Sequence, residues 1–329
     1  MKWPSRRFLD LVGVELPIIQ APMAGANGAA MASAVTRAGG VGSIPMAVGG
    51  GVSRLPDERP LNLNYFCHAE RARDPHRDAA WRAALGERFT GGEEARRRPF
   101  GAADVAFLEE LKPEIVSFHF GIPEILRVPP GIIVLATATS VAEAKFLEPH
   151  VDAIIAQGWE AGGHRGYFLK DGEMGTLALV PQIVDAVKIP VIAAGGISDG
   201  RGIAAAFALG ADAVQIGTTY LRTAESTIKY GHRLGEDTVV TNVFSGRPAR
   251  GLTNRLVEEV GPINPNAPPF PQAAADTAAL RAESPLDFGP LWSGQAASLA
   301  PPFRSSEDLT HHLATDAQDV LRRLASFAP

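Results

Sequence analysis

Short apolar runs alternate with helix-forming segments along this 329-residue chain, and the alternation predicts a (β/α)8 TIM barrel. Eight runs of strand length are present, which is the number that closes such a barrel. The runs are apolar on both faces, as expected for a parallel sheet that is covered on both sides. Glycine-rich turns follow the sixth, seventh and eighth runs, at the end of the barrel where ligands bind.

The rival fold is an open, doubly wound sheet. That fold places a G-x-G-x-x-G turn after its first strand. The first turn of this chain begins at Ala21 and reads Ala-Pro-Met-Ala-Gly-Ala-Asn-Gly, which is a different pattern. The closed barrel is therefore the favoured fold.

The first half of the chain supplies five strands and three helices. A glycine pair at residues 39–40 ends the first helix. Ser140 caps the third helix, with Glu143 at the position that a capping box requires. The predicted strands span residues 16–20, 41–45, 61–66, 114–121 and 132–136, and the predicted helices span 29–38, 104–111 and 141–147.

The second half completes the barrel and then changes character. Strands are predicted at 153–156, 189–194 and 213–219, with helices at 177–187 and 200–209. After residue 223 the alternation is lost. We expect a barrel domain over residues 1–222, completed by an amphipathic helix within 300–329, and a smaller, mainly helical cap over 223–299.

The segment from Cys67 to Arg98 is polar and is predicted to be a solvated helical insertion. Three consecutive arginines, Arg96 to Arg98, could form a phosphate-binding patch. Glu93 and Glu94 lie beside them, and a charged run of mixed sign favours a solvated face.

The overall composition excludes several classes of protein. A net charge of -5 argues against a nucleic-acid or anionic-membrane surface. Cys67 is the only cysteine, so no intrachain disulfide can form and secretion gains no support. The chain has neither a signal-peptide core nor an apolar run of membrane-spanning length. We expect a cytoplasmic protein that acts on small molecules without a metal ion, and the oligomeric state stays open.

His164 is the strongest candidate for proton chemistry. It lies in a glycine-rich loop, between Gly163 and Gly166, just beyond the sixth predicted strand. An imidazole beyond the end of a barrel strand can exchange protons near neutral pH. The alternative is a histidine that only holds a turn. Gln157 and the glycine loops farther along the chain favour the catalytic interpretation.

Two glycine turns predict a phosphate site. Gly195-Gly196 follows the seventh strand and Gly217-Thr218 the eighth, where barrels commonly bind phosphate through backbone N–H groups and a helix N-terminus. Pro22, Met23, Ala24, Asn64 and Gln157 lie at the ends of other strands. Amide and peptide groups suit an isoalloxazine edge, because each can donate and accept hydrogen bonds. Together these groups predict a pocket for flavin mononucleotide (FMN).

The sequence resembles the flavin-dependent nitronate monooxygenases, once called nitropropane dioxygenases. The resemblance covers nearly the whole chain except residues 67–113. It is carried by residues 20–25 (Gln-Ala-Pro-Met-Ala-Gly), 116–121 (Val-Ser-Phe-His-Phe-Gly), 157–166 (the glycine-histidine loop), 193–197, 210–218, 244–251 and 291–295.

The resemblance implies specific roles for these residues. His164 would be the base that removes the α-proton of a nitroalkane. The flavin would then take an electron from the nitronate, and O2 would complete its conversion to a carbonyl compound and nitrite. His119 is interpreted as a packed strand residue, although it lies near the same end of the barrel. The implied FMN contacts are Pro22, Met23, Ala24, Asn64, Gln157, Gly162, Gly196, Gln215, Ile216, Gly217 and Thr218.

Three other functions remain open. A flavin-dependent enoyl-acyl-carrier-protein reductase resembles the chain through the same glycine-histidine loop, and would use NAD(P)H. An inosinate-type dehydrogenase shares the glycine turns but needs a cysteine at the barrel mouth, and Cys67 lies elsewhere in the predicted fold. A flavin-binding protein without catalytic activity is the third, and His164 argues against it.

Overall fold

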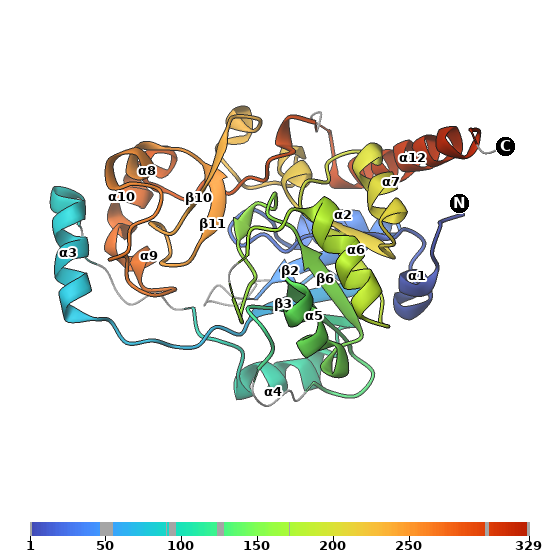
Figure 1. The fold of residues 1–329 in the computed structure, drawn as a ribbon, viewed down its shortest axis with the longest axis horizontal. Helices are drawn as coiled ribbons and strands as arrows, with labels where there is room; N and C mark the ends of the chain where they lie inside the picture. Colours follow the sequence, from blue (N-terminus) through green and yellow to red (C-terminus); the bar gives the residue numbers. More distant parts are fainter. Residues whose placement is uncertain are drawn as a thin grey trace.

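The computed structural model describes residues 2–46, 55–89, 91, 97–123, 128–170, 172–299 and 303–327. Within these residues, eight parallel strands form one sheet in the order β1-β9-β8-β6-β5-β4-β3-β2. The sheet closes into a barrel where Val41 bridges Ile19. Helices lie around this sheet (Figure 1). The strands are β1 (Ile18–Gln20), β2 (Gly42–Pro45), β3 (Leu61–Phe66), β4 (Ile115–His119), β5 (Ile133–Ala138), β6 (Ala153–Gln157), β8 (Val191–Ala194) and β9 (Ala213–Ile216).

All eight predicted strands are thus present, and the predicted TIM barrel is confirmed. The barrel interior holds buried side chains from most strands, such as Ile19, Leu135 and Ile192. Helix α1 (Arg7–Val12) adds Phe8, which is fully buried in the same cluster. This aromatic ring fills the amino-terminal end of the barrel, so the opposite end is left for a ligand.

Helices cover the outside of the barrel. The buried face of each helix packs on the outer side of the sheet in one large apolar cluster. Short 3₁₀ turns occur at η2 (Glu148–His150) and η3 (Thr218–Arg222). The covering helices are α2 (Ala29–Arg37), α4 (Ala102–Leu111), α5 (Val141–Leu147), α6 (Thr176–Ala186), α7 (Gly200–Ala208) and α12 (Ser306–Ala325).

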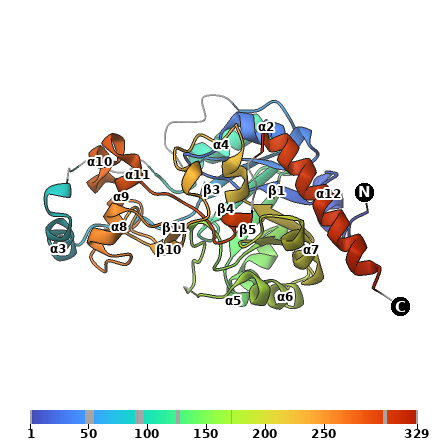
Figure 2. The same ribbon diagram turned by 90° about the horizontal axis from the view of Figure 1, so that it is seen from above.

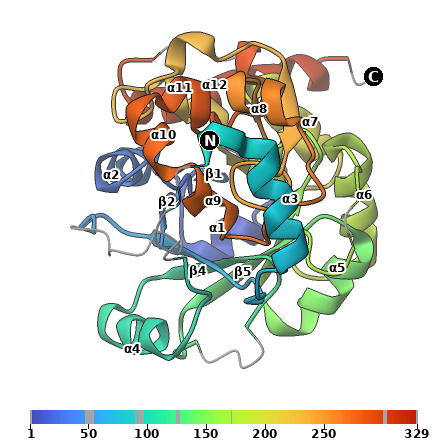
Figure 3. The same cartoon turned by 90° about the vertical axis from the view of Figure 1, so that its left-hand side faces the viewer.

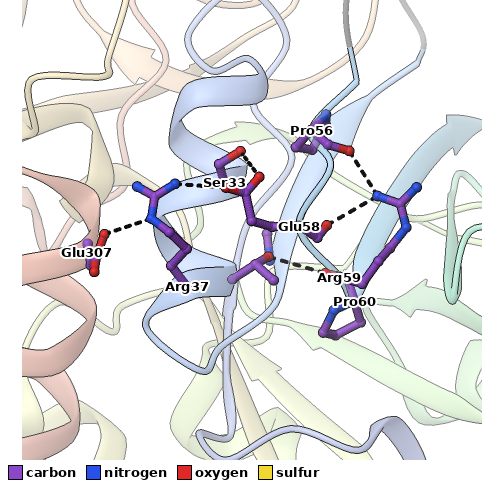
Figure 4. Close-up of polar contacts among 9 residues, drawn as sticks. Ser33, Arg37, Pro56, Glu58, Arg59, Pro60 and Glu307 are labelled. Carbon is purple, nitrogen blue, oxygen red and sulfur yellow. Dashed lines mark hydrogen bonds and ion pairs between the residues drawn. The ribbon is translucent and has the colours of Figure 1, made fainter.

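The C-terminal helix α12 returns to the barrel, as predicted. It packs between α2 and α7, where a Cβ on Gly200 would lie 2.3 Å from the Ala317 backbone nitrogen (Figure 2). Arg37 joins α2 to α12 through Glu307, at 3.0 Å, and to the β2–β3 connection through Glu58, also at 3.0 Å (Figure 4). Arg37 is exposed and both carboxylates are partly exposed, so the close helix packing, more than the ion pairs, holds α12 in place.

Residues 223–299, the predicted cap, lie beside the carboxyl ends of the strands. They contain the expected helices, but also two strands that the sequence pattern does not predict. Those strands, with the glycine-histidine loop, make a small antiparallel sheet in the order β10-β11-β7. The elements are β7 (Gly163–His164), η4 (Gly231–Arg233), β10 (Thr238–Thr241), β11 (Ala249–Leu252), α8 (Arg255–Val260), α9 (Ala273–Asp276), α10 (Ala278–Glu283), α11 (Pro285–Phe288) and η5 (Ala297–Leu299).

The polar excursion is joined to this cap. Helix α3 (Pro75–Leu85), followed by η1 (Gly86–Arg88), lies on the outer side of the cap, far from the barrel (Figures 1 and 3). Trp81 and Leu85 are fully buried against cap residues that include Phe244. We therefore propose that α3 belongs to the cap unit together with 223–299. No helix in the described ranges combines the length and the apolar character needed to cross a bilayer.

Candidate active site

A cavity of about 400 Å³ opens at the carboxyl ends of the barrel strands, between the barrel and the cap. It is lined by residues at the carboxyl ends of seven barrel strands and by residues of the cap segment 285–296. Eleven of the twelve predicted site residues line this cavity: Pro22, Met23, Ala24, Asn64, Gln157, Gly162, His164, Gly196, Gln215, Gly217 and Thr218.

Ile216 is the exception among the predicted site residues. It is almost fully buried in the apolar cluster outside the strands, and does not line the cavity. Its carbonyl accepts a hydrogen bond from the Ala21 N–H at 2.8 Å. The residue therefore holds the first strand-end loop beside β9.

The glycine loop that carries His164 is held by close backbone packing. A Cβ on Gly162 would lie 2.6 Å from the Gly294 nitrogen, so only glycine fits there. The N–H of Gln295 donates to the Glu160 carbonyl at 3.0 Å. The C-terminal segment 291–295 thereby fixes the loop, and it places Trp292 5.3 Å from the His164 ring.

His164 has one side-chain hydrogen bond among the described residues. Its Nε2 lies 2.9 Å from the Ser245 Oγ, and that hydroxyl lies 3.4 Å from the Arg247 carbonyl. If Nε2–H donates to Ser245 and Ser245 donates to the carbonyl, Nδ1 keeps its lone pair. Burial lowers the pKa of His164 well below its usual value, with a further contribution from the positive charge of Arg97. The imidazole is therefore neutral near pH 7.

Two side chains hold the backbone of the same residue. The Gln157 Nε2 donates to the His164 carbonyl at 3.0 Å, and the His119 Nε2 lies 3.2 Å from that oxygen. A carbonyl only accepts, so His119 carries its proton on Nε2, and its Nδ1 accepts from the Thr137 hydroxyl at 3.1 Å. Burial lowers the pKa of His119 to about 3. His119 is thus a packed residue, as expected, but it also lines the cavity and positions His164.

An aromatic wall surrounds the His164 imidazole. The ring centroids of Phe270, Phe120 and Phe66 lie 5.2, 6.0 and 6.1 Å from it. Phe120 has a backbone φ of 73°, a conformation that is strained for a bulky residue. Such strain is found where surrounding structure imposes a functional geometry. The wall keeps water away from the imidazole, which explains the direction of its pKa shift.

At the other end of the cavity, the turn after β8 presents free backbone donors. Gly195 and Gly196 have φ values of 103° and 72°, which favour glycine. The N–H groups of Gly196 and Ile197 have no acceptor among the described residues. The expected helix N-terminus is not available, because Asp199 already accepts hydrogen bonds from the first N–H groups of α7. A phosphate site here would rest on the turns themselves.

The middle of the cavity offers amide groups. Asn64 is buried, and its Nδ2 donates to the Ser117 hydroxyl at 3.0 Å. The Gln215 Oε1 is buried without a hydrogen-bond partner among the described residues, and this side chain lines the cavity. An unpaired buried acceptor is costly, so it favours a bound molecule that donates a hydrogen bond there.

The polar excursion also reaches the cavity. Arg97 lines it, so the expectation of a solvated face is wrong at this position, whereas Arg98 is largely exposed and pairs with Asp104. Arg96, Glu93 and Glu94 lie outside the described residues. Burial raises the pKa of the Cys67 thiol, so the only cysteine is not a ready nucleophile.

The comparisons with known proteins agree with one another. The family model for nitronate monooxygenase matches residues 5–316. A nitronate monooxygenase from Paraburkholderia phytofirmans is 39% identical, over 98% of each chain. A nitroalkane oxidase structure from Streptomyces ansochromogenes superposes with a TM-score of 0.85 at 33% identity, covering 97% of this chain and 99% of that one.

A more distant structural neighbour is FabK from Thermotoga maritima, with a TM-score of 0.68 and 28% identity over 98% of this chain and 99% of that one. The family model and the higher TM-score of the nitroalkane oxidase both favour the nitronate enzymes over FabK. The chain belongs to the nitronate monooxygenase family, and it is an oxidoreductase that acts on nitronates or nitroalkanes.

Proposed function

We propose that this enzyme binds FMN in the cavity and oxidises nitronates with O2 to a carbonyl compound and nitrite, and that His164 removes the α-proton when the substrate is a neutral nitroalkane. The observation that carries the proposal is that one cavity holds a neutral imidazole and a turn whose N–H groups have no acceptor among the described residues. A flavin bound there would supply the electron acceptor for the nitronate.

The cavity residues fit the chemistry of FMN. Gly196, Gly217 and Thr218 would hold its phosphate through backbone N–H groups. The orphaned acceptor of Gln215 and the amide of Asn64 would meet the polar edge of the ring. Pro22, Met23, Ala24 and Gly162 complete the walls, whereas Gln157 is largely engaged in holding the His164 loop.

The proposed base is the Nδ1 of His164. Ser245 occupies Nε2, so Nδ1 is the nitrogen left to accept a proton from carbon. A neutral imidazole is the basic form, and its lowered pKa keeps it in that form across the neutral range. His119 and Gln157 keep the His164 backbone in place, which limits the geometries that the imidazole can adopt.

The rival activity is a reductase that uses NAD(P)H, because FabK is a structural neighbour. The nitronate enzymes are favoured by the family match and by the higher TM-score of the nitroalkane oxidase. Rapid bleaching of the bound flavin by NADPH alone, at a rate competent for turnover, would favour the reductase.

The purified protein is expected to be yellow and to release non-covalent FMN on denaturation. The reason is that the chain has a pair of phosphate turns but no G-x-G-x-x-G turn after its first strand, the position of the fingerprint that binds dinucleotides. Mass spectrometry of the released ligand checks the result. FAD in the supernatant, or no flavin after reconstitution with FMN, would show that the proposed cofactor is wrong.

A further inference from the structure

Arg97 is a cation in the lining of the active-site cavity. In the part of the chain that the structure describes, no carboxylate or carbonyl lies within ion-pair or hydrogen-bonding distance of its guanidinium. Burial lowers the pKa of Arg97. The neighbouring Arg98 pairs with Asp104, and Arg73 pairs with Asp276 at 2.8 Å. Desolvating an arginine without an anion lowers stability, so Arg97 calls for a functional explanation.

The cavity lining around Arg97 carries little other charge. His119 and His164 are neutral, and the nearby walls are aromatic. Glu160 lines the cavity, but its carboxylate already accepts hydrogen bonds from the Thr176 N–H and hydroxyl. Lys229, the other cationic lining residue in the described ranges, is exposed. Arg97 is therefore the positive charge of the sheltered part of the cavity lining.

Other basic groups lie behind this lining. Arg247 contributes to the lowered pKa of His164, but its guanidinium lies over the Phe120 ring, 4.1 Å from the centroid, and donates to the Tyr167 carbonyl. Burial also lowers the pKa of His68, so that this imidazole is neutral. Neither residue lines the cavity. Arg247 adds to the positive field, but neither residue is placed to contact a bound molecule.

The positive charge of Arg97 reaches the imidazole of the proposed base. After burial, Arg97 is the largest cause of the lowered pKa of His164. Arg97 and His164 line the same cavity, and His164 stands against the wall formed by Phe66, Phe120 and Phe270. An anion bound beside the imidazole would therefore lie within the field of the guanidinium.

We propose that Arg97 binds the nitro oxygens of the substrate and is the counter-charge of the nitronate anion. The inference rests on the proposed function. When the α C–H bond breaks, its proton passes to His164 and its electron pair forms the C=N bond, so a full negative charge moves onto the two nitro oxygens. A planar guanidinium fork matches two oxygens in one plane, and burial strengthens the attraction.

Nitrate, a planar oxyanion that cannot react, tests this contact on the flavin-loaded enzyme. Calorimetry should show nitrate binding that weakens by about 10- to 100-fold in Arg97→Met, the effect of losing a hydrogen bond to a charged group. Arg98→Met is the matched control, because that adjacent arginine has its own carboxylate partner, and should bind nitrate like the parent. Arg97→Met should melt no lower than the parent, because it removes a half-buried charge that has no ionic partner among the described residues.

The pH dependence gives an independent readout. Removing the positive charge lets the pKa of His164 rise, and activity needs the neutral imidazole, so the acid limb of kcat/KM for a nitroalkane should move to higher pH in Arg97→Met. An unshifted limb, or unchanged nitrate binding, would overturn the proposal. The proposal would also be wrong if Arg97→Met raised KM only for nitronates that carry an additional carboxylate, because Arg97 would then contact that carboxylate and not the nitro oxygens.

The Arg97 contact and the proposed reaction can be tested separately. His164→Asn removes the base but leaves Arg97, so it should bind nitrate normally while losing nitroalkane turnover. If nitrate binding depends on Arg97 but the enzyme has no activity on nitro compounds, the anion site is supported and the proposed reaction is wrong.

Discussion

His164→Asn is expected to lower activity on a neutral nitroalkane by roughly 10²–10⁴, the usual contribution of general base catalysis. Asparagine is polar and of moderate size, but it cannot accept a proton from carbon near neutral pH. A pre-formed nitronate has already lost its α-proton, so its oxidation should fall much less. Steady-state rates on matched pairs, such as nitroethane and ethyl nitronate, measure the two losses.

The flavin content of the His164→Asn variant is the control for this comparison, and it should match that of the parent. Equal losses on both substrates would mean that His164 orients the substrate without removing a proton. An unchanged rate on both would return His164 to the role of a loop residue held by Ser245. An enzyme that accepts only nitronates would show little loss with this substitution.

The second large effect is expected from Gly196→Val, which should abolish FMN retention. The φ of Gly196 is 72°, a conformation that a β-branched residue strongly disfavours, so the turn that presents the free N–H groups would change shape. Absorbance at the flavin maximum after purification and dialysis measures the loss. A variant that folds and keeps FMN with parental affinity would place the phosphate elsewhere.

Gly131→Val is the matched control for backbone strain. Gly131 has a φ of 89°, a Cβ there would meet nothing within 4 Å, and the residue does not line the cavity. The control should lose stability but keep its flavin. Flavin loss in both variants would show that general destabilisation explains the effect.

The barrel could be predicted from the sequence because its signals are local. Each strand is a short apolar run with turn residues at its ends, and the parallel sheet buries both faces of each run. The cap was harder to predict. Strand β11 contains Arg250 and Gly251, and β7 is only Gly163 and His164, so neither has the apolar alternation that identifies a strand. Both depend on tertiary pairing.

The site could be predicted in outline for a similar reason. Strand-end residues share one end of a parallel barrel, so Asn64, Gln157 and Gln215 had to converge. The missed residues, Ser245, Phe270 and Trp292, come from the cap, and their approach to His164 depends on how the cap folds over the barrel. Arg97 departs from the expected solvated face because charge pattern alone does not reveal which member of an arginine run turns inward.

The most direct test of the proposed reaction is the absorption spectrum of the flavin-loaded enzyme under anaerobic conditions, followed after addition of a nitronate. We predict prompt bleaching of the flavin bands by the nitronate, recovery of the spectrum when O2 is admitted, and release of nitrite. A spectrum that stays unchanged with nitronates but is bleached by NADPH would contradict the proposed reaction and favour the reductase.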